Sequence, residues 1–171
     1  MMCPVKETTI LNFTEPSPEF SWNAIDDRIM GGESRSQPEY RTGIGLRFSG
    51  VVSLANKGGF ASIRSATGAF DLSPFSGLII RVRGDGREYK LSLRTDLFFD
   101  GISYQTSFAT TKDQWEEIRL PFAAFAPTHH GVRLSTVAPL EKAAVKSFGF
   151  FIADRQAGPF QLDIAWIKGA S

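Results

Sequence analysis

Two adjacent carboxylates, Asp26 and Asp27, stand in the stretch SWNAIDDRIMGGESRS, which runs from residue 21 to residue 36. Clustered carboxylates are ligands for hard cations such as Ca²⁺, and two coupled carboxyl groups can divide the roles of acid and base in catalysis. Neighbouring residues on an extended chain, however, point to opposite sides. We therefore expect at most one of the two carboxylates to face any given site.

The residues after the two carboxylates favour a structural interpretation. Gly31 and Gly32 permit a sharp turn, and aspartate is common in turns because its side chain accepts backbone N–H bonds. We expect one carboxylate to accept such bonds and the other to pair with an arginine, of which Arg28 is the nearest. Met30 is an adaptable apolar side chain that can plug the turn. The stretch is thus predicted to be a structural clasp, and a binding role at the same surface stays open.

The two histidines of the chain, His129 and His130, are adjacent and precede a glycine. Vicinal histidines on a loop can bind zinc, but neither a thiolate nor an i, i+4 spacing supports a site. A solvated loop is favoured, and we predict no metal and no cofactor. The sequence also lacks a G-x-S-x-G motif, a Cys-His signature and a G-x-x-x-x-G-K-[ST] loop. We therefore predict a protein that is not an enzyme.

Cationic and polar residues fall on the outward parity of several predicted strands. Arg64 ends one strand, Arg83 lies on the next, and Arg94 and Gln105 continue the pattern. The same parity includes Arg81, Lys90, Ser92, Ser103 and Ser107. If these strands are neighbours, the face could bind carboxylates, phosphates or sugar hydroxyls through the fork-shaped donors of arginine. An ordinary solvated sheet face is the alternative, and it is the commoner case.

The three tryptophans could stack on sugars, but structural roles compete with that interpretation. Trp166 is in phase with the apolar residues of FQLDIAWIK, so we predict that it is buried. Trp115 opens a predicted strand and resembles an edge anchor. Trp22, beside the DDRIMGG turn, is the tryptophan that we expect at a surface site.

Alternation of apolar and polar residues with a period of two predicts the elements that position these side chains. It is strongest in REYKLSLRT, ISYQTSFAT and FQLDIAWIK. Further strands are predicted at residues 8–13, 44–54, 58–65, 77–84, 115–120 and 146–154. NKGG at 56–59 and GDG at 84–86 resemble the turns of short hairpins, and only 139–146 has helix-forming residues, enough for two turns. The pattern predicts an all-β protein, an antiparallel β-sandwich in a single domain.

Composition restricts the partners and the compartment. The formal net charge is +1, so the overall balance does not call for nucleic acid. Cys3 is the single cysteine, which favours a reducing compartment and excludes an internal disulfide. No apolar run is long enough for a membrane span, and the first residues do not resemble an export signal. A cytoplasmic protein without a membrane span is expected.

Five ordered blocks carry a resemblance to a known family. They are WNAIDDRIMGGESRS, GGFASIR, RVRGDGREYKLSLRT, WEEIRLPFAAFAP and ADRQAGPFQLDIAWI. In this order the chain resembles the complex I intermediate-associated protein family, in a compact bacterial form without extra N-terminal regions. The resemblance implies a galactose-binding-like jelly roll over residues 8–168, preceded by a tail at 1–7.

The resemblance also implies a function and partners. Members of the family look like assembly factors for respiratory complex I, so we expect a noncatalytic, chaperone-like protein that binds protein subunits of a membrane complex of the NADH dehydrogenase type. The alternative is a small-ligand module that binds a carbohydrate or an anionic small molecule, because sandwiches of this kind carry many unrelated sites.

Overall fold

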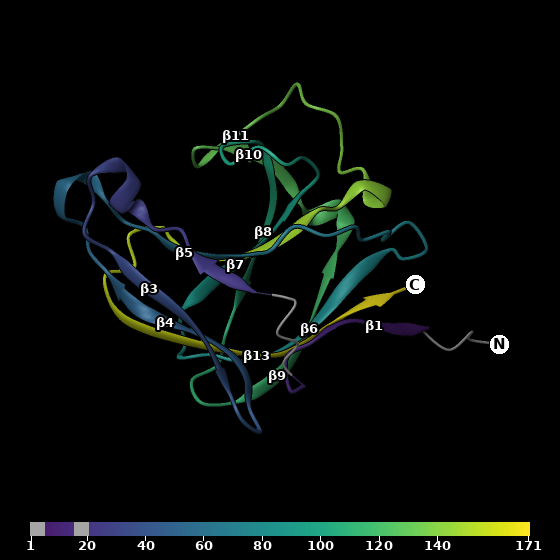
Figure 1. Ribbon diagram of the computed structural model, residues 1–171, viewed down its shortest axis with the longest axis horizontal. Helices are drawn as coiled ribbons and strands as arrows, with labels where there is room; N and C mark the ends of the chain where they lie inside the picture. Colours follow the sequence, from purple (N-terminus) through teal and green to yellow (C-terminus); the bar gives the residue numbers. More distant parts are fainter. Residues whose placement is uncertain (1–5, 16–20) are drawn as a thin grey trace.

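Two antiparallel β-sheets form the protein in the computed structural model, which describes residues 6–15 and 21–171 (Figure 1). The side chains of Ile29, Met30 and Lys57 lie outside the described part. The six-stranded sheet has the order β3 (Arg35–Arg41), β4 (Gly45–Val52), β13 (Gly158–Ala170), β6 (Gly77–Arg83), β9 (Trp115–Pro121), with β1 (Glu7–Asn12) also paired to β13. The seven-stranded sheet has the order β11 (Val132–Arg133), β10 (Ala126–His129), β8 (Ser103–Ala109), β7 (Glu88–Arg94), β12 (Ser147–Ile152), β5 (Ala61–Ser65), β2 (Trp22–Ala24). The prediction of an all-β antiparallel sandwich is confirmed.

The core lies between the two sheets and follows from the alternation in the sequence. Tyr89 and Leu91 of β7 are completely buried, and the intervening Lys90 faces away from the core. Phe48 of the six-stranded sheet packs against Tyr89 with ring centroids 6.3 Å apart, so aromatic rings join the sheets directly. Period-two patterning thus fixes which face of β7 is buried and leaves the other face for a site.

All nine predicted strands are present, and the described part contains four more. The additional strands are β2, β3, β10 and β11. β3 lies at the edge of the six-stranded sheet and contains Pro38. An edge strand tolerates proline, because the side of the strand that faces solvent needs no backbone N–H to pair with another strand. β2, β10 and β11 are at most four residues long, too short to show a period.

The two turns predicted to close hairpins instead connect the two sheets. NKGG and GDG do contain residues with positive φ, among them Asn56 at 53° and Gly86 at 89°. However, β4 and β6 belong to the six-stranded sheet, whereas β5 and β7 belong to the seven-stranded sheet. The hairpin prediction is therefore wrong: a residue that accepts positive φ lets the chain reverse, but it does not select the strand that pairs next.

The helix predicted at 139–146 is reduced to one short 3-10 turn, Lys142–Ala144. Backbone groups on both sides of this turn bond to distant segments, since Leu72 N–H donates to Lys142 and Lys146 N–H donates to Arg94. Val145 is completely buried. Tertiary contacts therefore override helix propensity here. None of the described helical segments has the length and apolarity required to cross a bilayer.

Trp166 is half-buried, so the prediction of a buried Trp166 is wrong. The register of β13 against β6 shifts between Ile164 and Trp166, which marks a β-bulge. The bulge reverses the parity of the strand, so that Ala165 and Ile167 are buried while Trp166 lies under the ammonium group of Lys168 at 4.1 Å. Period-two reasoning fails at this residue because one extra residue intervenes.

Candidate functional site

The Asp27 carboxylate begins the 3-10 turn η1 (Asp27–Met30) and is almost completely buried, at 1% exposure. It accepts the Ser34 N–H at 2.9 Å and the Ser34 hydroxyl at 2.6 Å. It also accepts the N–H groups of Gly59 at 2.7 Å and Phe60 at 3.2 Å. Burial by itself would raise the pKa of Asp27, but these hydrogen bonds outweigh it and hold the pKa below its ordinary value.

Asp26 makes an equivalent set of bonds on the other side of the chain. Its carboxylate accepts the N–H of Ser36 at 2.8 Å, the hydroxyl of Ser36 at 2.5 Å and the N–H of Ser62 at 2.9 Å. The two carboxylates therefore point to opposite sides, as expected for neighbours on an extended segment. Together they join η1 to β3, β5 and the segment before β5.

The clasp differs from the predicted one in its partners. In the described residues neither carboxylate pairs with an arginine, and the donors are serine hydroxyls and backbone N–H groups. Gly31 has a φ of 87° and allows the turn, while a Cβ added to Gly32 would lie 2.5 Å from the Asp27 carboxyl carbon. The second glycine is thus needed for close approach. The predicted plug, the Met30 side chain, lies outside the described part.

A cleft of about 540 Å³ lies on the outer face of the seven-stranded sheet. Its floor combines cationic, polar and aromatic side chains: Arg64, Lys90, Arg94, Gln105, Phe60 and Phe151. The loop between β7 and β8 and the turn between β10 and β11 form its rim, through residues such as Phe99, Asp100 and His130. The cleft thus places cationic, polar and aromatic side chains around one hollow.

Arg64 of β5 and Arg94 of β7 lie on either side of β12 in this cleft. Each donates to a carbonyl of the rim loop at 3.0 Å, Arg64 to Phe99 and Arg94 to Gly101. In the described part, neither forms an ion pair with a carboxylate. Burial lowers the pKa of Arg64 to about 10, and the nearby charge of Arg94 adds to that effect. Burial also lowers the pKa of Arg94, so both guanidinium groups would gain from an added anion.

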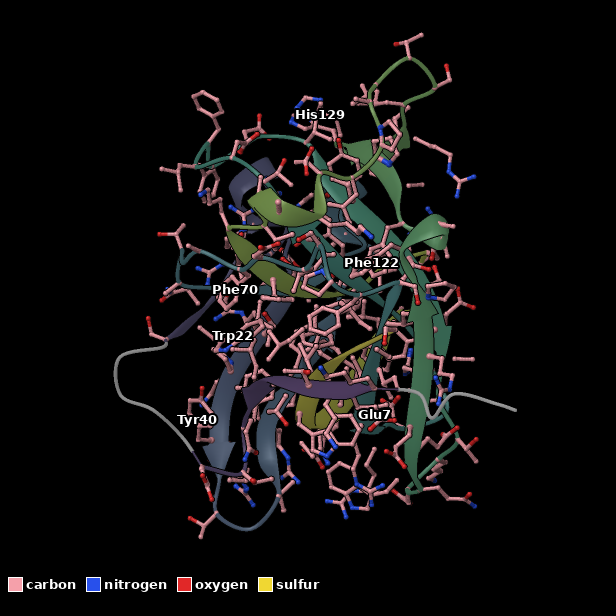
Figure 2. The ribbon with its side chains drawn as sticks, turned by 90° about the vertical axis from the view of Figure 1, so that its right-hand side faces the viewer. Glu7, Trp22, Tyr40, Phe70, Phe122 and His129 are labelled. Carbon is pink, nitrogen blue, oxygen red and sulfur yellow. The ribbon has the colours of Figure 1, made fainter. Side chains whose placement is uncertain are left out.

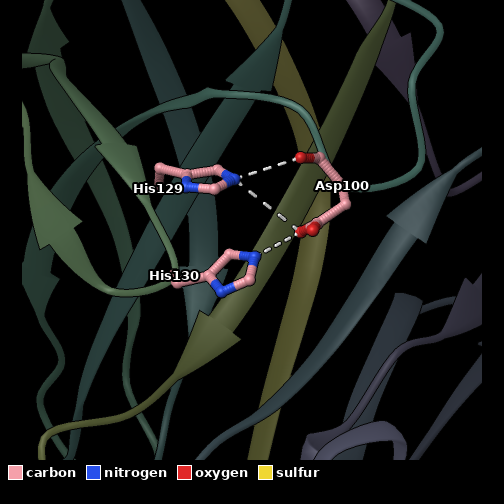
Figure 3. A group of neighbouring side chains, drawn as sticks. All are labelled: Asp100, His129 and His130. Atoms are coloured by element: carbon pink, nitrogen blue, oxygen red, sulfur yellow. Dashed lines mark hydrogen bonds and ion pairs between the residues drawn. The ribbon is translucent and has the colours of Figure 1, made fainter.

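Three further polar groups gather at the rim of the cleft. The His130 Nε2 lies 2.7 Å from the Asp100 Oδ1, and the His129 Nε2 lies 3.2 Å from the Asp100 carbonyl oxygen (Figure 3). The imidazole centroids are 4.1 Å apart. The expected solvated loop is therefore exposed but not unstructured, because both histidines contact one aspartate from another loop.

Gln105 and Arg28 occupy different surfaces. Gln105 lies in the cleft and donates from Nε2 to the Ser103 hydroxyl at 2.9 Å. Arg28 is exposed and lines a second, more open hollow with Asp26 and Arg35. The structure thus brings Arg64, Arg94 and Gln105 together and leaves Arg28 beside them, outside the main cleft.

Arg83 does not share this face, so the expectation that it lies beside Arg64 and Arg94 is wrong. It belongs to β6 of the six-stranded sheet, because the GDG turn passes from one sheet to the other. Its Nη2 lies 3.0 Å from the Oδ2 of Asp163, a carboxylate that is completely buried and also binds Arg47 at 2.8 Å. Arg83 is therefore part of a structural ion-pair group.

Trp22 is 7% exposed and belongs to the core, so the expectation of a surface site at this residue is wrong. Its ring packs edge-on against Phe13 with centroids 5.6 Å apart. Figure 2 shows Trp22 within the sandwich and His129 at the end of the molecule that carries the rim. β2 pairs with β5 by its backbone and turns this side chain inward.

Sequence reasoning missed the aromatic floor of the cleft. Phe151 follows Phe148 and Phe150, which are buried in the core, and it points to the opposite face of β12. The sequence did contain a signal for this floor, because Phe151 is a large apolar residue at a position whose parity predicts exposure. The contact of Asp100 with the two histidines had no such signal, because it depends on how two loops meet.

Comparison with known proteins identifies the family to which the chain belongs. The model of the family described as complex I intermediate-associated protein 30 (CIA30) matches residues 11–164. The chain belongs to this family. The DDRIMGG stretch and the cleft-lining strands β5, β7, β8 and β12 all lie within the matched range.

Two relatives carry the family name. The chain is 33% identical over 103 residues to the mitochondrial complex I intermediate-associated protein 30 of Mus musculus, an alignment that covers 58% of this chain and 31% of the relative. It is 28% identical over 158 residues to the protein of the same name from Neurospora crassa, covering 82% of this chain and 57% of the relative. This CIA30 chain thus spans from about a third to just over half of the length of these relatives.

The fold is also that of a carbohydrate-binding module. The family 11 carbohydrate-binding module from Clostridium thermocellum, solved with a β-1,3-1,4-mixed-linked tetrasaccharide, superposes with a TM-score of 0.68. The match covers 95% of this chain and 94% of the module at 16% sequence identity. At this identity the likeness concerns the jelly-roll fold of the CIA30 chain alone.

Proposed function

We propose that this protein is a noncatalytic assembly factor that binds protein subunits of an NADH dehydrogenase-type respiratory complex. The observation that carries the proposal is the family match over residues 11–164, which includes nearly every strand of the sandwich. The relatives named for complex I intermediates support the same assignment. We also propose a cytoplasmic location, which the single cysteine supports.

The cleft on the seven-stranded sheet is the proposed binding site. Arg64 and Arg94 offer two partly desolvated guanidinium groups that each donate to a backbone carbonyl, and Arg64 also lies over the ring of Phe99. Fork-shaped donors of this kind bind carboxylates in two-point geometry. Phe60 and Phe151 add apolar surface beside them. A partner segment that presents a carboxylate next to an apolar side chain fits these features best.

A carbohydrate ligand is the second candidate, and the shared jelly-roll fold favours it. Sugar sites commonly use aromatic faces and hydrogen-bonding groups, both of which line the cleft. A neutral sugar, however, would bring no negative charge to the two neighbouring guanidinium groups, whose pKa values burial lowers. Trp115 and Trp166 belong to the six-stranded sheet, and Trp22 to the core. The charges therefore favour an anionic protein segment over a neutral glycan.

Affinity capture from the native host, followed by mass spectrometry, tests this function. We expect subunits of the respiratory complex to be enriched on the wild-type protein and lost on Arg64→Gln/Arg94→Gln. Arg119→Gln is the matched control, because Arg119 is exposed on the other sheet. A glycan array run with the same proteins tests the second candidate. Enrichment that is absent, or equal in the double variant, would overturn the assignment of the cleft.

A further inference from the structure

We propose that Asp100, His129 and His130 form a binding site for Zn²⁺ or a similar transition-metal ion at the rim of the cleft. This inference goes beyond the assembly function and does not depend on it. The three residues come from two separate segments, since Asp100 lies between β7 and β8 whereas His129 ends β10. One ligand atom from each lies within 4.8 Å of the other two.

The direction of the two imidazoles is the first argument. Figure 3 shows that both histidines present Nε2 toward Asp100. The two rings are tilted by 30° to one another. Consecutive residues on a strand would point to opposite sides. Here His130 and Gly131 have φ values of 50° and 77°, so a tight turn begins between the two histidines. The turn therefore gives vicinal histidines the common direction that their sequence spacing does not supply.

The separations of the ligand atoms are the second argument. The Asp100 Oδ1 lies 2.7 Å from the His130 Nε2 and 4.0 Å from the His129 Nε2. A tetrahedral zinc ion holds nitrogen and oxygen ligands at about 2.0–2.2 Å, which separates these atoms by about 3.3–3.6 Å. The observed distances lie on either side of this range. Small rotations of exposed side chains would therefore bring all three atoms into one coordination shell.

The kind of ligand indicates the kind of metal. Two imidazoles and one carboxylate suit Zn²⁺, Co²⁺, Ni²⁺ or Cu²⁺, whereas Ca²⁺ and Mg²⁺ prefer shells made of oxygen. Three protein ligands leave a fourth position of a tetrahedral ion open. Asp100 and His130 also line the cleft, so an ion here would stand at its edge. It would join the β7–β8 loop, which carries Phe99, to the β10–β11 turn.

Calorimetric titration of the full chain with zinc chloride, after treatment with a chelator, tests the site. A Cys3→Ser background removes the single thiol as a competing ligand. We expect one zinc ion per chain, and a loss of affinity of about tenfold or more in His129→Ala, His130→Ala and Asp100→Asn. Asp113→Asn is the matched control, an exposed aspartate at a turn with a φ of 60°.

Melting measured without and with zinc separates binding from folding. Zinc should raise the melting temperature of the wild type and of Asp113→Asn, and it should not raise that of the three site variants. Without zinc all variants should melt together, because the replaced side chains are 41% to 68% exposed. The inference is overturned if the wild type shows no saturable binding or if His130→Ala binds zinc as tightly as the wild type.

Discussion

Asp27 and Ser34 hold each other through two hydrogen bonds, from the Ser34 N–H at 2.9 Å and from its hydroxyl at 2.6 Å. The Ser34 hydroxyl oxygen in turn accepts the N–H of Ser53 at 2.9 Å. A carboxylate and a serine seven residues apart thus fix the turn between β2 and β3. The DDRIMGG stretch is explained by this clasp, in which each carboxylate meets a different serine.

Removal of the Asp27 carboxylate should destabilise the fold. Asp27→Ala leaves the buried N–H of Ser34 and the partly buried N–H groups of Gly59 and Phe60 without their acceptor, which should lower the free energy of unfolding by about 2–4 kcal/mol. Arg28→Ala, an exposed change at the next residue, should alter it by less than about 0.5 kcal/mol. Urea denaturation measures both, and equal midpoints for the two variants would contradict the clasp.

The same carboxylate predicts how stability changes in acid. The pKa of Asp27 is lower in the folded protein, so the unfolded chain binds the proton more tightly. The stabilisation it supplies is present above the unfolded pKa, at about 3.9, and is lost as the pH falls through the folded value. Unfolding free energies measured in a series from neutral pH downward should therefore fall more steeply below about pH 4 for the wild type than for Asp27→Asn. Parallel curves for the two proteins would show that the Asp27 carboxylate makes no pH-dependent contribution to stability.

A methyl group at Gly32 should disturb the clasp through crowding. The added Cβ would lie 2.5 Å from the carboxyl carbon of Asp27, so either the turn or the carboxylate must move. We expect Gly32→Ala to cost more than Gly43→Ala, whose Cβ would meet nothing within 4 Å but whose φ of 76° costs about 1–2 kcal/mol. Thermal melting of the two variants provides the comparison, and a smaller loss in Gly32→Ala would refute the close approach.

Arg83 should behave as a structural residue. Arg83→Ala removes a hydrogen-bonded charge from the buried Asp163, which keeps Arg47, and should lower stability by about 1.5–3 kcal/mol. Arg41→Ala, which breaks a surface pair with Glu39, should change it by less than about 1 kcal/mol. Both variants should capture partners as well as the wild type does. If Arg83→Ala lost partner capture while its melting temperature stayed unchanged, Arg83 would be a binding residue and not a structural one.

Local patterning predicted the strands well because half-buried strands alternate along the sequence. The parity of Tyr89 and Leu91 identified the buried face of β7 and placed Arg94 on the opposite face. The same reasoning failed at Trp166, where one bulged residue reverses the parity. A pattern with a period of two cannot detect the insertion of a single residue within a strand.

The candidate site was only partly predictable, because strand neighbours are decided by tertiary packing. Arg83 and Arg94 lie on strands that follow one another in the sequence, β6 and β7. The GDG turn between these strands connects the two sheets, so the two arginines lie on different sheets. Arg64 and Arg94 lie close together only because β12, far along the chain, pairs with both β5 and β7. The meeting of Asp100 with His130 depends likewise on two loops that no local pattern connects.

The affinity of a captured respiratory-complex subunit for the cleft tests whether Arg64 and Arg94 bind the partner. We would measure it for the wild type, Arg94→Gln and Arg119→Gln at two salt concentrations. We expect Arg94→Gln to weaken binding by about tenfold or more, since a charge-assisted hydrogen bond contributes about 1.5–3 kcal/mol. We also expect wild-type binding to weaken with salt and Arg119→Gln to bind as the wild type does. Equal affinities for the wild type and Arg94→Gln, with no dependence on salt, would contradict a cleft that binds its partner through these two arginines.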